Sequence, residues 1–285
     1  IRARYALGCD GRRSAARRLA GIEMAGDRYE EPWIAISGEV DDPPPTMPSA
    51  RFVCDPHRPG FVARGAMRQC RWELMLRPGE TADTVERPEA VARFIAPYVD
   101  PARVRIERAS IYTFEAKTAA RWRSGRLLLL GDAAHTMPPM MGQGLVSGLR
   151  DAANLAWKLD LVLRGVAGER LLESYEVERR PHVEAMTAIS RRIGMVMLVR
   201  DPRAAAARDM FFRALGRIPR ARRFFRDVEF KPPATLEAGA FVGGGARRGE
   251  AQGTLFPQPL VRAGDGREVR LDDALGPGFA VLGMG

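Results

Sequence analysis

Apolar residues follow two different spacings on either side of residue 140. Residues 127–130 are four consecutive leucines, and such a run is typical of a strand buried on both faces, as in a parallel sheet. After Gly144, apolar residues recur every three or four positions, which is the spacing of one helical face. That face would contain Leu145, Leu149, Ala152, Ala156, Leu159 and Leu163. The pattern predicts a buried strand over 126–130, a loop, and a helix that runs to Arg164.

The loop between these two elements has the features of a ligand site. Asp132 follows the strand directly, and ligands bind at this edge of open α/β sheets. Gly142 and Gly144 leave N–H groups uncovered at the helix start, where the dipole favours an anionic or electron-rich group. A glycine-rich turn that only permits close packing is the alternative. Because strand, acid, proline pair and helix occur in order, we expect a cofactor loop.

A second strand, turn and helix are predicted at the start of the chain. Residues 5–9 alternate weakly and lead into Asp10 and Gly11, after which a short helix begins with Ser14 as its N-cap. An Asp-Gly pair alone is a common turn. Its position upstream of the first loop, about a hundred residues away as such folds require, makes the pair of motifs specific.

The segment between the two motifs predicts an antiparallel sheet with short Pro- and Gly-rich turns. Its expected strands are 33–40, 51–54, 60–64, 71–77 and 104–116, with a helix over 87–98 that has Val91, Phe94 and Ile95 on its apolar face. Further on, 169–199 predicts a long amphipathic helical region. Pro181 lies inside it, so a break or kink is expected there.

Composition is that of a globular protein with one to two domains. The chain has 285 residues, of which 46% are hydrophobic, and no apolar run approaches the roughly 18 residues of a membrane span. The three cysteines, Cys9, Cys54 and Cys70, are odd in number and lack metal-like spacing. They favour a reducing, cytoplasmic setting. The three histidines are too scattered to indicate a metal site.

The net charge of +10 raises nucleic-acid binding as a second class of function. The excess is almost entirely arginine, since lysine occurs only at positions 117, 158 and 231. The arginines are spread along the chain and do not form a stripe interleaved with aromatics. A solvated basic surface is the simpler interpretation, so we expect neither a nucleic-acid nor a membrane partner.

Several motifs together resemble those of the FAD-dependent aromatic-ring monooxygenases, the family of para-hydroxybenzoate hydroxylase and phenol hydroxylase. They are residues 131–135 (Gly-Asp-Ala-Ala-His), Pro138-Pro139, Gly142-Gln143-Gly144 and the run 150–159. The resemblance implies that Asp132 binds the ribityl chain of FAD and that backbone amides of 142–146 face the pyrimidine end of the isoalloxazine. Many relatives have Asn where this chain has Val146, which leaves only a backbone contact at that position.

The Asp-Gly region is similar to the family motif associated with both FAD and the nicotinamide donor. The cofactor-binding residues implied by the two motifs are Asp10, Gly11, Ser14, Arg17, Gly131, Asp132, Ala133, Pro139, Gly142, Gln143, Gly144, Leu145 and Val146. The family's amino-terminal Gly-x-Gly-x-x-Gly unit has no counterpart, and the glycines at 243–245 do not replace it. We therefore expect a fragment of a longer gene product.

The resemblance implies an α/β fold, α+β overall. An incomplete, Rossmann-like, three-layer FAD-binding domain would carry an inserted antiparallel-sheet substrate domain. The expected parts are 1–31 with the Asp-Gly motif, 32–116 as the substrate domain, 117–231 with the Gly-Asp motif, and 232–285 as a linker and a further domain.

A further set of short sequence motifs resembles those of the 3-(3-hydroxyphenyl)propionate hydroxylase group. It includes residues 54–56, 71–76 and 78–80, and Tyr112-x-Phe114. The tail, with 255–259, 271–276 and 278–282, is similar to the start of that group's thioredoxin-like carboxyl-terminal domain, ending after its first strand.

The implied activity is hydroxylation of a phenolic aromatic acid through a flavin hydroperoxide, with O₂ and NADH or NADPH. Trp72, Tyr112 and Pro138 are candidate substrate contacts, with sheet packing the alternative for the two aromatic residues. His135 is a proton relay or a buried histidine bonded to loop carbonyls. The catalytic base is not identified. Other flavin monooxygenase chemistry, such as epoxidation or polyketide-ring hydroxylation, and an inactive fragment stay open, as does a homo-oligomer.

Overall fold

Two sheets organise residues 1–232 in the computed structural model. The structure describes residues 1–45, 47, 49–241, 252–276 and 278–280, and it divides into two units, 1–232 and 233–285. The smaller sheet of the first unit has the order β1 (Ala6–Gly8), β8 (Leu127–Leu129) and β7 (Arg123–Ser124). β1 and β8 are parallel. The predicted leucine strand is therefore present, paired in parallel with the strand of the Asp-Gly motif.

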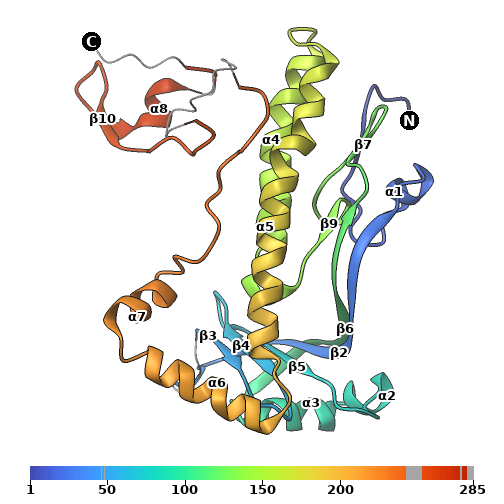
Figure 1. The fold of residues 1–285 in the computed structure, drawn as a ribbon, viewed down its shortest axis with the longest axis vertical. Helices are drawn as coiled ribbons and strands as arrows, with labels where there is room; N and C mark the ends of the chain where they lie inside the picture. Colours follow the sequence, from blue (N-terminus) through green and yellow to red (C-terminus); the bar gives the residue numbers. More distant parts are fainter. Residues whose placement is uncertain (46, 48, 242–251, 277, 281–285) are drawn as a thin grey trace. The chain divides into compact units, whose positions relative to one another are not determined.

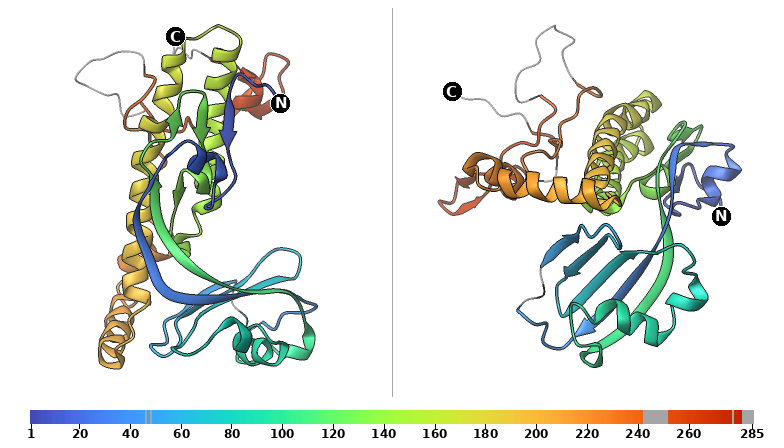
Figure 2. Two further views of the ribbon diagram at one scale, coloured as in Figure 1. Left: turned by 90° about the vertical axis from the view of Figure 1, so that its right-hand side faces the viewer. Right: turned by 60° about the horizontal axis from the view of Figure 1, so that its bottom comes forward.

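The larger sheet is antiparallel and has six strands. Its order is β3 (Ala50–Val53), β4 (Gly60–Arg64), β5 (Gln69–Met75), β2 (Met24–Val40), β6 (Val104–Ala119) and β9 (His135–Thr136). β2 and β6 are long curved strands that run from the neighbourhood of β1 and β8 into this sheet (Figure 2). The expected boundaries at 31/32 and 116/117 thus lie inside continuous strands. β2 pairs with β6 on both sides of a register shift between Arg28 and Pro32, so both strands continue past these boundaries.

The two faces of the larger sheet have different roles. Ile34, Ile36 and Trp72 point to one face, where they form a core with Val91 and Ile95 of α3 (Pro88–Ile95). Two short elements lie beside α3, namely α2 (Ala82–Val85) and η1 (Pro101–Arg103). The opposite face contributes a smaller cluster. The predicted sheet with one covering helix is present, although the helix is shorter than expected.

Helices α4 (Gly144–Leu163) and α5 (Glu173–Met197) lie side by side, joined through η4 (Glu169–Leu172) (Figure 1). The extent of α4 agrees with the prediction, but the apolar face identified from the leucine spacing is not the buried face. Leu145 and Leu149 are 78% and 61% exposed. The buried positions are Ser147, Asp151, Leu155, Lys158 and Val162. Leucine spacing misidentified the face because the surface buried against the rest of the unit is largely polar and hydrogen-bonded.

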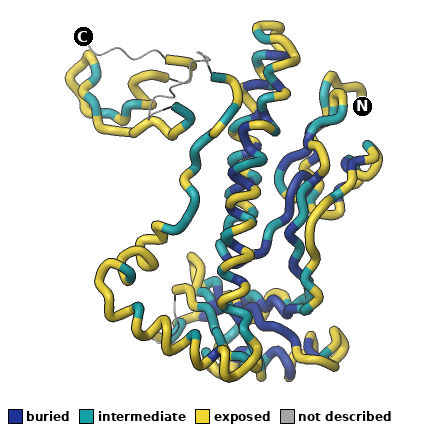
Figure 3. Tube along the Cα trace, in the orientation of Figure 1, coloured by how far each residue is buried: buried dark blue, intermediate teal, exposed yellow. Residues whose placement is uncertain are grey.

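α5 continues through Pro181 without the expected break. Proline removes one backbone hydrogen bond, and Val177, the acceptor one turn earlier, is exposed and open to water. Buried residues on both sides of Pro181, including Arg179 and Val183, hold the helix in place. Two further helices follow, α6 (Pro202–Leu215) and α7 (Pro219–Arg226), and both are largely exposed (Figure 3).

Residues 233–285 form the second unit. β10 (Leu260–Arg262) and β11 (Glu268–Arg270) pair as a hairpin, followed by α8 (Leu271–Leu275). Residues 278–280 of the expected strand have no strand geometry, and 281–282 lie outside the described residues, as do the glycines at 243–245.

Candidate functional site

The predicted cofactor loop joins the two sheets. After β8 it forms η2 (Gly131–Ala133), then β9, which pairs with Lys117 and Thr118 of β6, and then η3 (Pro139–Met141). The turn at Gly131 has φ +56°, which favours glycine. A Cβ on Gly148 of α4 would lie only 3.3 Å from the Gly131 Cα, so two glycines let the loop approach the helix closely.

Asp132 lies at the exposed end of this loop. Partial desolvation raises the pKa of its carboxyl, while the nearby His135 and Arg12 oppose that shift. None of the hydrogen bonds found among the described residues uses its carboxylate. The side chain is therefore able to accept hydrogen bonds from a ligand.

The first turn of α4 presents backbone donors to the same region. Its N-cap, Gln143, makes no side-chain capping bond, and Ser147 is the first residue whose N–H bonds back into the helix start. Amides at 144–146 are thus available to an electron-rich group. Gly142 is not, because its N–H donates to the Pro139 carbonyl at 2.8 Å. Gln143 Oε1 is buried without a hydrogen-bond partner in the described part of the chain.

Arg17 connects the two predicted motifs. Its side chain is buried and donates to the carbonyl of Ala133 in the loop and to that of Arg12, both at 2.9 Å. Ser14 caps α1 (Ala15–Leu19) by accepting from the Arg17 N–H at 2.9 Å, as predicted. The Asp10 carboxylate accepts from two amides at the start of α1. Its hydrogen bond with Ser14 lowers the pKa of Asp10 first, and the amide bonds add to this. Asp10 thus holds the turn together.

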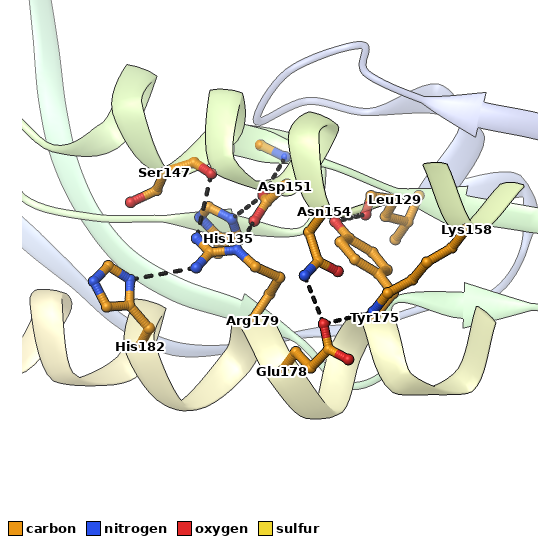
Figure 4. A network of polar contacts seen from close by, with 11 residues as sticks. Leu129, His135, Ser147, Asp151, Asn154, Lys158, Tyr175, Glu178, Arg179 and His182 are labelled. Atoms are coloured by element: carbon orange, nitrogen blue, oxygen red, sulfur yellow. Dashed lines mark hydrogen bonds and ion pairs between the residues drawn. The ribbon is translucent and has the colours of Figure 1, made fainter. Parts of the chain in front are cut away.

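Behind the loop, a buried polar network links it to α4 and α5 (Figure 4). Asp151 is fully buried and accepts hydrogen bonds from the Gly131 N–H at 3.0 Å and from Arg179 Nε at 3.0 Å. His135 Nε2 lies 2.7 Å from Asp151 Oδ2. His135 is therefore buried, as one alternative had it, but its partner is a carboxylate and not a loop carbonyl.

The same two helices share a second buried set of hydrogen-bonded side chains, one helical turn further on (Figure 4). Lys158 Nζ donates to Glu178 and to Ser174, and Asn154 also donates to Glu178. Burial lowers the pKa of Lys158, and the ion pair with Glu178 opposes this. Tyr175 fixes α5 to β8 through the Leu129 carbonyl at 2.9 Å. Sequence periodicity missed both groups, because buried ion pairs interrupt an apolar pattern.

An apolar cavity of about 360 Å³ lies between the larger sheet and η3. Aromatic side chains of the sheet form one wall, and the other side is made by η3 and the end of α5. The lining residues are Trp33, Phe52, Val53, Gly60, Phe61, Glu73, Phe114, Pro139, Met140, Met141, Gly142, Met197 and Leu198. The cavity thus adjoins the loop that leads into α4.

The three candidate substrate contacts are placed differently. The prediction that Trp72 contacts the substrate is wrong, because Trp72 is fully buried in the core on the face of the sheet opposite to the cavity. Tyr112 is half-buried, and its hydroxyl donates to Glu73 at 2.5 Å. Pro138 precedes the lining residue Pro139 and does not itself line the cavity. Side chains alternate along β5, so Glu73 points to the face of the sheet opposite to that of Trp72. This alternation was the sequence signal that could have placed Glu73 on the cavity face.

A second, polar groove of about 680 Å³ lies beside the Asp-Gly motif. Six cationic side chains gather there, namely Arg12, Arg13, Arg17, Arg18, Arg28 and Lys117. Part of the positive charge of the chain is therefore concentrated in one concave surface. In the described residues, no helix is long and apolar enough to cross a membrane. No cluster of metal-binding side chains occurs among them either.

Comparison with known protein families gives two matches, one in each part of the chain. The FAD binding domain family matches residues 1–190, and the HcaD C-terminal domain family matches residues 253–285. The chain is 41% identical over 284 residues to a 3-(3-hydroxy-phenyl)propionate/3-hydroxycinnamic acid hydroxylase of Mycobacterium avium (strain 104). That match covers 99% of this chain and 49% of the relative, so the chain spans about half the length of the curated relatives it matches.

Solved structures agree with this assignment. OxyS, the anhydrotetracycline hydroxylase from Streptomyces rimosus, is similar with a TM-score of 0.70 and 26% identity, over 94% of this chain and 52% of that one. PyrE3, a Diels-Alderase from pyrroindomycin biosynthesis, has a TM-score of 0.68 and 26% identity, over 98% and 59%. The predicted fold class and the predicted FAD cofactor are confirmed at the level of the family. This chain belongs to the FAD binding domain family, with relatives among the flavin-dependent aromatic hydroxylases.

Proposed function

We propose that the protein hydroxylates a phenolic aromatic acid such as 3-(3-hydroxyphenyl)propionate, using FAD, O₂ and NADH or NADPH. One observation carries this proposal, namely the aromatic cavity that adjoins the loop between η3 and α4. An aromatic ring in that cavity would lie next to the residues expected to face the flavin. The relative from Mycobacterium avium carries the same activity in its name.

The residues of the loop fit FAD. Asp132 can accept hydrogen bonds from ribityl hydroxyls, and the amides of 144–146 can donate to the electron-rich pyrimidine edge of the isoalloxazine. The unpartnered buried oxygen of Gln143 offers one further acceptor for a ring N–H. When bound, FAD would supply the activated oxygen, and the protein would bind, orient and shield the substrate.

The volume of the cavity supports a one-ring substrate. Ligand sites for small molecules span about 300–1,000 Å³, and the cavity of about 360 Å³ lies near the lower end of that range. A fused polyketide would need more room than a phenylpropionate. Phenol recognition is therefore favoured over polyketide-ring hydroxylation on this scaffold.

The basic groove beside the Asp-Gly motif suits the phosphates of the nicotinamide donor. Its six cations outnumber the two acids that also line it, Glu23 and Glu115, and guanidinium groups pair well with phosphate oxygens. We place the protein in the cytoplasm, where its three free cysteines would stay reduced.

The proposal is tested by product analysis. Protein loaded with FAD is given 3-(3-hydroxyphenyl)propionate, NADH and O₂, and the expected product is the corresponding catechol. Flavin reduction without a catechol would overturn the proposed substrate. A colourless protein that added FAD cannot restore would show that this chain alone is not a working enzyme. Flavin-independent, salt-sensitive binding of duplex DNA would favour the nucleic-acid alternative.

A second chemistry on the same scaffold is the competing proposal. The similarity to a Diels-Alderase supports it, because a fold shared with hydroxylases then hosts a different reaction. Epoxidation of an unsaturated side chain would give a product with the phenol unchanged. Mass and fragmentation of the product distinguish the epoxide from the catechol.

A further inference from the structure

Glu73 is the one ionisable side chain among the described residues that line the aromatic cavity. It lies on β5 opposite Phe61 of β4 and Ala35 of β2, and these three side chains share the cavity face of the sheet. Only 7% of the residue is exposed. A carboxylate in such a wall is costly unless it is paired, so its position calls for a chemical account.

Two neighbours hold the carboxylate in place. Arg71 Nε donates to one oxygen of Glu73, and the Tyr112 hydroxyl donates to the other at 2.5 Å. A carboxylate has about four acceptor positions, so these two bonds leave capacity for a donor that enters the cavity. Neither Arg71 nor Tyr112 competes with Glu73 as the acceptor for that donor. Burial and the charge of Glu73 raise the pKa of Tyr112, which keeps the phenol of Tyr112 protonated.

Arg71 and Tyr112, the two partners of Glu73, also connect the cavity to a second depression on the same face of the sheet. Arg71 and Tyr112 line that depression of about 240 Å³, together with Arg12, Ser37, Arg108 and Ser110. The side chain of Arg71 is about half exposed. Glu73 therefore lies between an apolar cavity and a polar, cationic recess.

We propose that Glu73 is the catalytic residue that accepts the proton of the substrate's phenolic hydroxyl, while Arg71 and Tyr112 position its carboxylate. This inference rests on the proposed function and assigns its catalytic base.

Proton transfer to a carboxylate is favourable only at one stage of the reaction. As the ring carbon forms its new bond to the oxygen atom that FAD would supply, the O–O bond of that donor would break and its electron pair would leave on the other oxygen. The phenol oxygen thereby becomes a carbonyl, and its O–H bond becomes strongly acidic. That bond breaks and an O–H bond forms on Glu73. When the ring carbon then loses its hydrogen as a proton to water, the C–H electron pair restores aromaticity and the carbonyl oxygen takes back a proton from Glu73. The carboxylate is regenerated, and it neither gains nor loses electrons.

The position of Glu73 also sets the orientation of the substrate. A carboxylate in a wall of low dielectric repels a second carboxylate nearby. The phenolic end of the substrate would therefore face Glu73, and its acid group would point toward the other end of the cavity. This orientation brings the hydroxyl, and not the acid, to the proton acceptor.

The test compares Glu73→Gln with the wild type in the FAD-loaded protein. The amide keeps the shape of the side chain but cannot accept and carry the proton. General-base catalysis contributes roughly 10²–10⁴-fold, so the hydroxylation rate should fall by about that factor. The rate of flavin reduction by the nicotinamide donor should stay unchanged, so that reduced flavin is spent on hydrogen peroxide. Glu89→Gln, on the exposed start of α3, is the matched control and should keep full hydroxylation.

Hydroxylation by Glu73→Gln at the wild-type rate would overturn the inference and leave the proposed function intact. Absence of hydroxylation by the wild type would instead remove the proposed function. If Glu73→Gln fails to retain FAD, Tyr112→Phe takes its place. Loss of this donor leaves the Glu73 carboxylate less well positioned, so kcat for hydroxylation should fall while the rate of flavin reduction stays unchanged. An unchanged kcat would overturn the inference.

Discussion

Asp10 and Asp132 are the acids of the two predicted motifs, and their carboxylates have different hydrogen-bonding roles in the structure. Asp10 uses its carboxylate to bond the first amides of α1. Asp132 has no such partner and lies at the exposed end of the predicted cofactor loop. Residue type and motif alone do not separate these roles, because both acids follow a strand and precede a helix. The difference comes from where each side chain points.

Asp132→Ala is expected to weaken FAD binding by about 10- to 100-fold. A hydrogen bond to a charged group contributes roughly 1.5–3 kcal/mol, and each 1.4 kcal/mol changes a dissociation constant about tenfold. Titration of the protein with FAD, followed by flavin fluorescence, measures the change. Asp160→Ala on the exposed side of α4 is the control. Equal FAD affinity for Asp132→Ala and wild type would refute the role of Asp132.

His182 makes the stability of the fold depend on pH. Burial, with the positive charges of Arg179, Arg150 and Lys231, lowers the pKa of His182 to about 4, and Asp151 opposes this. Between pH 6.5 and 4 the unfolded chain therefore binds a proton that the folded chain does not. Stability is complete above pH 6.5 and falls as the pH drops to about 4, by up to about 3 kcal/mol. Urea unfolding at several pH values measures this. His182→Gln should flatten the dependence, whereas the exposed His57→Gln should not.

At the scale of elements, α4 shows where sequence periodicity succeeds and where it fails. Its length follows from the glycine-rich start and the continuous pattern to residue 163. Its orientation does not, because Asp151 and Lys158 occupy the buried face as members of hydrogen-bonded pairs. Periodicity counts such residues as surface. Only the partners on α5, some 20 to 28 positions away in sequence, reveal that they are satisfied inside.

Two leucine substitutions on α4 test which face is buried. Leu155→Ala removes a fully buried side chain and should lower the free energy of unfolding by about 2–5 kcal/mol. Leu149→Ala removes an exposed one and should change it by about 0.5 kcal/mol or less. Chemical denaturation of this chain measures both. A larger loss for Leu149→Ala would restore the orientation that leucine spacing predicts.

The buried network between α4 and α5 should be far more sensitive than the surface of the same helix. Asp151→Ala leaves Arg179, His135 and the Gly131 N–H without their acceptor, and breaking a buried pair costs about 3–5 kcal/mol. Asp160→Ala removes an exposed pair with Arg164, which contributes about 0–1 kcal/mol. Thermal melting points measure the difference, and similar losses for both variants would contradict the network's importance.

At the scale of the whole molecule, local patterns predicted most elements, and contacts distant in sequence did not follow from them. The leucine strand, the Ser14 cap and β4 were all predicted from residues within a few positions of one another. Pairing of β9 with β6 and the bond from Arg17 to the Ala133 carbonyl join segments up to 116 residues apart. The aromatic cavity combines residues from the strands β2 to β6, from η3 and from the end of α5. Its position beside the flavin loop, which carries the functional proposal, needed the structure.

We propose that this cavity and loop support oxygen transfer from O₂ to a phenolic acid. Mass spectrometry of the product formed under ¹⁸O₂ tests it most directly, with FAD-loaded protein, NADH and 3-(3-hydroxyphenyl)propionate. The expected product is a catechol that carries one ¹⁸O atom in its new hydroxyl group. A product without label, or consumption of NADH with only hydrogen peroxide formed, would contradict it.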